Sequence, residues 1–202
     1  MDGTDSMDVH ECILRYLDGD ADAMDAMVER YRRPLFGFIR SMTGSGADAD
    51  EVYQETWFRA LRSLPRYRAR NFPGWLFRIA RNLLIDRQRK RKPDVSMDEE
   101  NSDGISLGHV LAGPEPAPDE AAAALETGRR VALAVAQLPA AQREVFIMRV
   151  QAGLTFREIA VIQKASINTV LARMQYALRK LRDELREDYG HLAGSDGKDV
   201  LP

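Results

Sequence analysis

The sequence predicts an all-α protein built from two small helical domains that are joined by a flexible acidic linker. Apolar residues recur at three-to-four spacing in two separate regions, and no segment alternates as a strand does. Charge is also segregated: residues 66–92 carry ten basic side chains and one acid, and residues 127–186 carry eleven bases and four acids. Residues 93–126 hold nine acids and no lysine or arginine. We therefore expect two basic modules separated by an acidic spacer.

Composition limits the function classes. Cys12 is the only cysteine, so no intramolecular disulfide can form. With His10 it offers two ligands where a structural zinc site needs four, so we expect no metal and no cofactor. We see no phosphate loop and no motif that pairs a nucleophile with a base, so we do not expect an enzyme. The acidic N-terminus is no secretory signal and no apolar run is long enough to span a membrane, which predicts a cytoplasmic protein without membrane insertion.

The first domain is expected over residues 19–92, after an acidic extension at 1–18. Asp20 is a good N-cap for its first helix, because a carboxylate accepts hydrogen bonds from free amides of the first turn. Apolar residues continue beyond Pro34, so this proline is expected to kink the helix without ending it. The apolar positions are Ala23, Met24, Met27, Val28, Tyr31, Leu35, Phe36, Phe38 and Ile39.

Two more helices complete the first domain. One is expected over residues 48–64, between a turn at 43–46 and Pro65, and the next from Phe72 to about Lys92. The predicted buried positions of the earlier helix are Val52, Trp57, Phe58, Ala60, Leu61 and Leu64. The predicted apolar stripe of the later helix consists of Trp75, Leu76, Ile79, Ala80, Leu83 and Leu84.

The acidic spacer is expected to be a linker over residues 93–124. It contains four prolines and few large apolar side chains, so it cannot bury enough surface to offset chain entropy. The next helix is expected to begin at Ala121–Glu126. We hypothesise that, when the chain is free in solution and no polymerase holds the linker extended, the linker acids fold back on the basic modules and weaken DNA binding.

The second domain is expected over residues 125–187, before a disordered tail at 188–202. Helices are predicted at Thr127–Gln137 and at Ala140–Val150, with Gly153 as the C-terminal cap of the latter.

A helix-turn-helix is predicted in the remainder of this domain. The capping box Thr155–Glu158 begins a short helix over 156–163, and the turn Lys164–Ser166 leads to a long basic helix ending near Glu187. In this motif the second helix lies in the major groove of DNA, whereas the alternative is an ordinary helical hairpin. Its predicted buried stripe is Val170, Met174, Ala177, Leu178, Leu181 and Leu185. Its predicted reading face is Asn168, Thr169, Ala172, Gln175, Tyr176 and Arg179, with Arg173 at the border.

Basic and aromatic residues are mixed in residues 66–92. Cations bind phosphates without regard to sequence, and flat rings stack on unpaired bases. This segment therefore predicts binding to nucleic acid, including separated strands. The alternative is a solvated helix face above a few aromatic core residues.

Five segments carry a resemblance to a known family. They are G19–I39, D48–L61 and N71–K92 in the first domain, and L138–A160 and S166–V170 in the second. Together and in this order they resemble the sigma-70 family of RNA polymerase sigma factors. The match is with the extracytoplasmic-function (ECF) group, which keeps only the second and fourth conserved regions. The resemblance covers about residues 19–92 and 125–186.

The resemblance implies a non-enzymatic subunit that directs core polymerase to promoters and helps to melt the −10 region. Its implied partners are the β′ clamp helices of core polymerase, promoter DNA and an anti-sigma factor. The implied polymerase-binding residues are Asp48, Glu51, Gln54, Glu55 and Trp57. The implied −10 contacts are Tyr67, Asn71, Phe72, Trp75, Arg78, Arg81, Asn82, Asp86, Arg87 and Arg89. The implied −35 contacts are Thr155, Asn168, Thr169, Arg173, Gln175, Tyr176 and Arg179.

Three positions depart from the family pattern. Lys164 stands where the family usually has a turn glycine, so we expect a strained turn. Leu171 and Tyr176 stand where the family usually has basic residues, which is expected to change phosphate anchoring and base preference at −35.

Two other functions fit parts of the sequence. A stand-alone helix-turn-helix regulator explains the second domain, but it needs neither an acidic docking helix nor an aromatic segment for melting. A helical interaction protein treats the basic stretches as solvated surface, and salt-sensitive DNA binding would exclude it.

Overall fold

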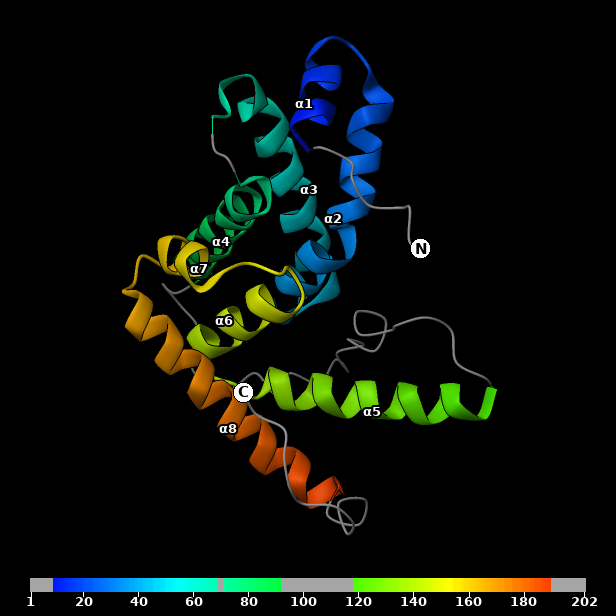
Figure 1. The fold of residues 1–202 in the computed structure, drawn as a ribbon, viewed down its shortest axis with the longest axis vertical. Helices are drawn as coiled ribbons and strands as arrows, with labels where there is room; N and C mark the ends of the chain where they lie inside the picture. The colour runs from blue at the N-terminus through cyan, green and yellow to red at the C-terminus, as the bar shows by residue number, and fades with distance from the viewer. Residues whose placement is uncertain (1–8, 69–70, 92–117, 190–202) are drawn as a thin grey trace.

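Every regular element in the described part of the chain is a helix, which confirms the predicted fold class. A computed structural model describes residues 9–68, 71–91 and 118–189, and within these ranges we find α-helices and one short 3-10 helix but no strand (Figure 1). The predicted linker core at 93–117 and the end of the predicted tail at 190–202 lie outside the described residues.

The first module is a bundle of α1 to α4. The elements are α1 (Val9–Leu17), α2 (Ala21–Met42), α3 (Gly46–Ser63), the 3-10 helix η1 (Leu64–Arg66) and α4 (Phe72–Arg91). Asp20 caps α2 as predicted, accepting from the amides of Asp22 and Ala23 at 3.1 and 3.3 Å. Helix α2 also continues through Pro34 as expected. The core of this module includes Met27, Leu35, Phe38, Ile39, Val52, Trp57, Phe72, Leu76 and Phe77.

The second module consists of α5 to α8, and three of its helices follow the predicted boundaries closely. The elements are α5 (Pro118–Ala136), α6 (Ala140–Val150), α7 (Phe156–Gln163) and α8 (Ile167–Tyr189). Helix α8 packs against α5, α6 and α7. Its apolar stripe, with Val170, Ala177 and Leu181, closes a small aliphatic core.

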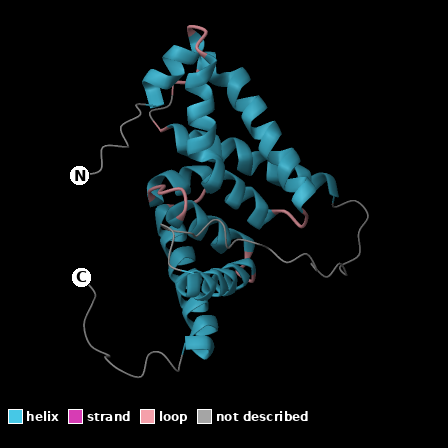
Figure 2. Ribbon diagram, turned by 90° about the vertical axis from the view of Figure 1, so that its right-hand side faces the viewer, coloured by secondary structure: helices cyan, strands magenta, loops and turns pink. Residues whose placement is uncertain are grey.

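The two modules pack against each other. Helix α4 contacts α7, and α2 contacts α6. In Figure 2 the first module forms the upper part of the molecule and the second module the lower part. We call this packing the closed arrangement.

Several expectations need correction. Helix α1 was not predicted, yet Cys12 and Ile13 are buried where it packs on α2. Helix α5 begins at Pro118, inside the segment expected to be linker. Phe58 was expected to be buried but is 55% exposed, because the neighbouring Trp57 takes the core-facing position. Leu178 was also expected in the core and is exposed.

Candidate nucleic-acid interface

The aromatic residues before and at the start of α4 form one connected cluster. The ring centroids of Tyr67 and Trp75 are 4.9 Å apart, and Phe72 lies 5.8 Å from Tyr67 and 5.5 Å from Trp75. Phe72 is only 2% exposed, so it is a core residue and not the base-contacting ring we expected. Tyr67 and Trp75 are half-buried and form the outer layer of the cluster. Two rings therefore remain accessible on a rigid aromatic base.

Burial in this cluster changes the chemistry of Tyr67. Desolvation raises the pKa of its phenol to about 12, and nearby Tyr31 adds to the rise. A phenol is already neutral at pH 7, and the raised pKa keeps this hydroxyl neutral at alkaline pH as well, so it can accept or donate a hydrogen bond without adding negative charge near DNA.

Asn71 fixes the start of α4. Its side-chain Oδ1 accepts from the amide of Gly74 at 3.0 Å, and its carbonyl accepts from the amide of Trp75 at 3.2 Å. Gly74 leaves room for this side chain, because an added Cβ would lie 2.8 Å from Asn71 Nδ2 and the amide would have to shift. Asn71 therefore has a structural role that its residue type, a common helix cap, could have indicated.

The polar side chains of α4 fall into two groups. Arg78, Asn82, Asp86 and Arg89 are exposed. The other two predicted DNA contacts, Arg81 and Arg87, are engaged by carboxylates within the protein.

Arg87 ties α4 to the acidic face of α3. Its Nη2 donates to Asp48 at 2.5 Å and to Glu51 at 2.8 Å. Hydrogen bonds to Glu51 and Asp48 raise the pKa of Arg87, because both carboxylates stabilise the charged guanidinium. These hydrogen bonds join Arg87, which we expected to contact DNA, to Asp48 and Glu51, which we expected to contact polymerase. The sequence did not suggest this connection.

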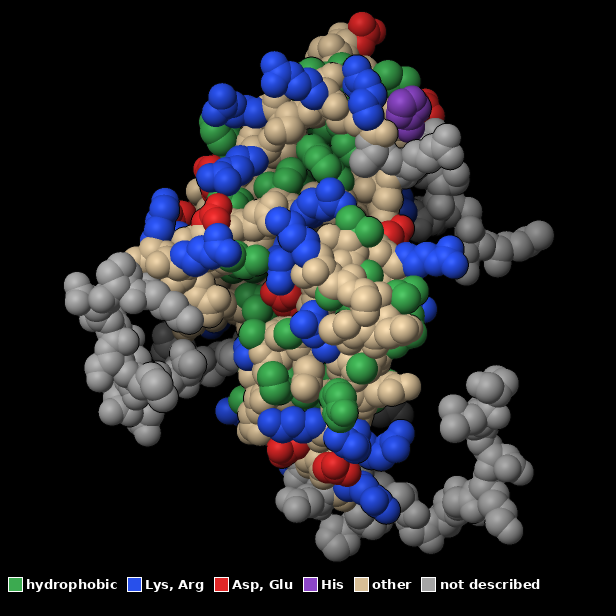
Figure 3. All heavy atoms as spheres, turned by 90° about the vertical axis from the view of Figure 1, so that its left-hand side faces the viewer, with side chains coloured by type: hydrophobic (Ala, Val, Ile, Leu, Met, Phe, Trp, Pro, Cys, Tyr) green, Lys and Arg blue, Asp and Glu red, His purple; other side chains and the backbone are tan. Residues whose placement is uncertain are grey.

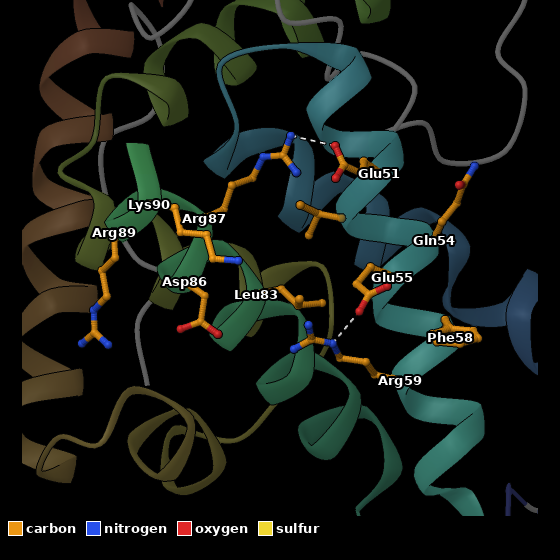
Figure 4. Close-up of a pocket in the computed structure, with 11 residues that line it drawn as sticks. Glu51, Gln54, Glu55, Phe58, Arg59, Leu83, Asp86, Arg87, Arg89 and Lys90 are labelled. Atoms are coloured by element: carbon orange, nitrogen blue, oxygen red, sulfur yellow. Dashed lines mark hydrogen bonds and ion pairs between the residues drawn. The ribbon is translucent and has the colours of Figure 1, made fainter. Parts of the chain in front are cut away.

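The predicted polymerase-binding residues do not all share a surface. Trp57 is 6% exposed and belongs to the core, so its predicted contact with a partner needs correction. Gln54 is exposed, and Glu55 forms an ion pair at 2.7 Å with Arg59. Phe58 lies on the same outer side as Gln54 (Figure 4). Its helical spacing of four from Gln54 was the signal that could have identified it.

A groove of about 1200 Å³ lies between α3 and α4 (Figure 4). Carboxylates of α3 and cationic groups of α4 line it, with Leu83 between them. Its lining residues are Glu51, Val52, Gln54, Glu55, Phe58, Arg59, Leu83, Asp86, Arg87, Arg89 and Lys90. The rim thus presents both charge signs and one exposed ring.

The helix-turn-helix has well-defined caps. Thr155 and Glu158 form the predicted capping box: Thr155 Oγ1 accepts from the Glu158 amide at 3.3 Å and Glu158 Oε2 accepts from the Thr155 amide at 2.7 Å. Ser166 Oγ accepts from the Thr169 amide at 3.1 Å at the start of α8. Thr155, predicted to contact DNA, is exposed and serves first as a cap.

The turn between α7 and α8 accommodates Lys164 in the left-handed region, with φ 53° and ψ 44°. Among the described residues it is the sole non-glycine with positive φ. Its amide donates toward the carbonyls of Ala160 and Val161, and the Ala165 amide donates to the Ala160 carbonyl at 3.0 Å. The turn therefore keeps regular capping bonds and concentrates its strain in one residue.

The predicted reading face of α8 is exposed. Its exposed members are Asn168, Thr169, Gln175, Tyr176 and Arg179. The guanidinium of Arg179 lies 4.9 Å from the ring centroid of Tyr176. Arg173 is partly buried, and its Nη1 donates to Gln163 Oε1 at 2.7 Å. Leu171 and Leu178 add apolar contact surface on this helix.

Lysine and arginine side chains are spread over the side of the molecule that carries α4, α7 and α8 (Figures 1 and 3). They extend from the first module to the end of α8, and fewer carboxylates are visible on this face. Such a distribution attracts a polyanion to both modules. Across the described ranges we find no cluster of three metal-ligating side chains and no helix with the length and apolarity to cross a membrane.

Comparisons with known proteins agree with this organisation. Residues 27–93 match the family model for Sigma-70 region 2, and residues 128–181 match the model for Sigma-70, region 4. The chain is 30% identical to the ECF RNA polymerase sigma factor SigW of Bacillus subtilis, over 84% of this chain and 92% of SigW. It is 31% identical to the ECF RNA polymerase sigma factor SigD of Mycobacterium tuberculosis, over 83% of this chain and 79% of SigD.

Solved structures share the fold. The sigma factor RpoE in complex with the anti-sigma factor NepR, from Bartonella quintana, matches with a TM-score of 0.60 and 20% identity, covering 82% of this chain and 98% of RpoE. CnrH in complex with the cytosolic domain of CnrY matches with a TM-score of 0.59 and 24% identity, covering 88% of this chain and 97% of CnrH.

Proposed function

We propose that this chain, which belongs to the ECF group of the sigma-70 family of RNA polymerase sigma factors, directs core polymerase to specific promoters and helps to melt their −10 region. The observation that carries the proposal is the pairing, in one chain, of an acidic docking helix and a basic-aromatic helix with a helix-turn-helix. A stand-alone regulator needs only the last of these. The protein would act in the cytoplasm, where polymerase is.

The proposed polymerase contact is the outer side of α3. Glu51, Gln54 and Glu55 offer negative and polar groups to a basic partner, and Phe58 adds an exposed ring one turn after Gln54. Aromatic side chains at interface centres often carry much of the binding energy. We propose the β′ clamp helices of core polymerase as the partner of this surface, with Asp48 acting through its ion pair with Arg87.

The proposed −10 contact is the start of α4 with the segment before it. Tyr67 and Trp75 supply accessible ring surface for separated bases, and Arg78, Asn82 and Arg89 supply polar contacts along the duplex. Taking a base out of the stack costs a few kcal/mol, and each aromatic stack returns about 1–3 kcal/mol. Two rings can therefore offset most of the cost of unstacking one base.

The proposed −35 contact is the exposed face of α8. Amide groups of Asn168 and Gln175 can form paired hydrogen bonds with adenine, and Arg179 can reach guanine or phosphate. Leu171 and Tyr176 favour apolar contact with thymine methyl groups over phosphate anchoring.

An anti-sigma factor is a further proposed partner. Of the two solved structures described above, one is a sigma factor in complex with an anti-sigma factor, and the other is CnrH in complex with the cytosolic domain of CnrY. Their likeness to this chain in fold supports the proposal.

Transcription in vitro tests the function. Core polymerase should gain selective start sites on a promoter library when the purified chain is added, and a pull-down should recover the chain with core polymerase. DNA binding without polymerase association would instead support a stand-alone regulator. Neither DNA nor polymerase binding would support a helical interaction protein.

A further inference from the structure

The exposed face of α8 carries a stacked pair of side chains. The guanidinium of Arg179 lies 4.9 Å from the ring centroid of Tyr176, which is 51% exposed. Side chains of an α-helix lean toward its N-terminus, so Arg179 reaches back over the residue one turn before it. Among the described residues Arg179 forms no ion pair, although Asp183 stands one turn after it. The guanidinium is therefore supported by a ring, and its donors remain available to a ligand.

Arg173, the other arginine of this surface, is engaged within the second module. Its side chain is partly buried, and its Nη1 donates to Gln163 Oε1 of α7 at 2.7 Å. Gln163 is only 7% exposed, so this bond belongs to the packing of α7 on α8. Of the two arginines, Arg179 is thus the one that meets DNA from an exposed position. Its contact with the ring lies within one helix, so it does not depend on the closed arrangement.

Arg179 continues the line of amide side chains on α8. It follows Asn168 by eleven residues and Gln175 by four, and both spacings return to the same face of a helix. All three side chains are exposed. Eleven residues rise about 16 Å along the helix axis, which matches about five base pairs at 3.4 Å each. With α8 in the major groove, Arg179 meets the DNA at the opposite end of the contacted segment from Asn168.

The stacked guanidinium favours a base edge over a phosphate. A phosphate is bound by charge and accepts a mobile lysine as well as an arginine, whereas guanine offers O6 and N7 to two N–H donors in one plane. Holding that plane before binding reduces the entropy that is lost on binding. The ring of Tyr176 is such a support, because a cation is attracted to the negative face of an aromatic ring.

We propose that Tyr176 positions Arg179 to read a guanine at one end of the −35 element, through paired hydrogen bonds to O6 and N7. This inference rests on the proposed −35 contact of α8. Arg179 is the residue that contacts the base, and Tyr176 is a positioning residue that acts through it. A paired contact of this kind favours guanine over other bases by about five- to a hundredfold. The ring contributes about two- to fivefold of that preference.

Nuclear magnetic resonance of the free chain tests the stack itself. A proton above an aromatic ring is shifted upfield, so the Nε proton of Arg179 should resonate upfield of that of Arg182, an exposed arginine of the same helix. Tyr176→Leu should abolish this shift, and Tyr176→Phe should retain it because it keeps the ring. Tyr176 is exposed, so both variants should keep the circular dichroism spectrum and the Tm of the wild type. A shift that survives in Tyr176→Leu would overturn the inference.

Selection from duplexes randomised over the contacted segment measures the base preference, with the purified chain alone and with the chain bound to core polymerase. Arg179→Lys keeps the charge but loses the planar fork, so the preference for guanine should fall about tenfold while the salt dependence of binding is kept. Tyr176→Leu should lower the same preference by about two- to fivefold and leave the bases read by Asn168 and Gln175 unchanged. Tyr176→Phe should retain the wild-type preference. The matched control Arg182→Lys should change no base preference.

The double variant Tyr176→Leu with Arg179→Lys should prefer guanine as weakly as Arg179→Lys alone, because the ring acts through the arginine. Additive losses would show that the ring reads DNA independently and would overturn the inference. So would an unchanged guanine preference in Arg179→Lys, which is the result expected for a phosphate contact, or a wild-type chain that selects no guanine in either form. A chain that selects guanine but gives core polymerase no start sites would contradict the proposed function and leave this base contact standing.

Discussion

The two modules of this protein differ in the interactions that stabilise each of them. All the buried aromatic rings of the described residues belong to the first module: Tyr31, Phe38, Trp57, Phe72 and Phe77. The second module has an aliphatic core and relies on caps at successive helix starts, with Thr155 before α7 and Ser166 before α8. The first candidate DNA surface therefore depends on non-local packing, and the second depends more on hydrogen bonds formed within a few residues. This difference predicts which substitutions damage each surface.

The largest effect is expected for Phe72→Ala in the first module. Phe72 touches Tyr31, Trp57, Tyr67 and Trp75 at ring-centroid distances of 5.5 to 6.4 Å, so its loss leaves a cavity beneath the accessible rings. We expect a loss of about 3–5 kcal/mol in the free energy of unfolding, measured by urea denaturation. The control Phe58→Ala should change it by no more than about 0.5 kcal/mol, because this ring is exposed. Equal losses would contradict the assigned core.

The second largest effect is expected on polymerase binding by Phe58→Ala. The exposed ring next to Gln54 and Glu55 is the large apolar group of the proposed docking surface. We expect about tenfold weaker binding to core polymerase, corresponding to about 1.4 kcal/mol, with stability unchanged. Fluorescence anisotropy of a labelled chain gives the affinity. Leu14→Ala removes an equally exposed apolar side chain from α1 and should leave binding unchanged; a matching loss there would indicate a general effect of surface hydrophobicity.

Sequence reasoning succeeded where structure is set locally. The spacing of Thr155 and Glu158 predicted the capping box and the bounds of α7, because both partners lie within one turn. It placed Trp57 in the core correctly but also assigned it a polymerase contact, and it wrongly expected Phe58 to be buried, because only tertiary packing decides which of two adjacent aromatics faces the core. It also missed the bond between Arg81 and Glu144, which are far apart in sequence and lie in different modules. The charge pattern predicted that α4 is basic, but it did not predict which of its arginines form ion pairs with carboxylates of the protein.

A smaller effect is expected for Thr155→Ala in the second module. Its hydroxyl satisfies the Glu158 amide at the start of α7, and substitutions of such caps cost about 1 kcal/mol. Hydrogen exchange should show faster exchange of amides in the first turn of α7, with the amides of α2 and α4 unaffected. Thr155→Ser retains the hydroxyl and should restore protection. If Thr155→Ser restores protection but not DNA affinity at a −35 element, the methyl group contributes to the proposed DNA contact. Unaltered exchange in Thr155→Ala would contradict the capping role.

The smallest effect is expected at the turn before α8, where Lys164 has a positive φ of 53°. Gly153, in the turn between α6 and α7, has a comparable φ of 65° and serves as its control. Lys164→Gly relieves the steric cost of this conformation but adds freedom to the unfolded chain and removes a cation from the C-terminal end of α7. The terms nearly cancel, so we expect a stabilisation of about 0.5 kcal/mol or less, seen as a small rise in Tm. Gly153→Ala meets no neighbouring atom within 4 Å, so its cost should come from backbone strain alone, at about 1 kcal/mol. A clear loss of stability in Lys164→Gly would mean that the lysine contributes more through its charge than it costs through its backbone.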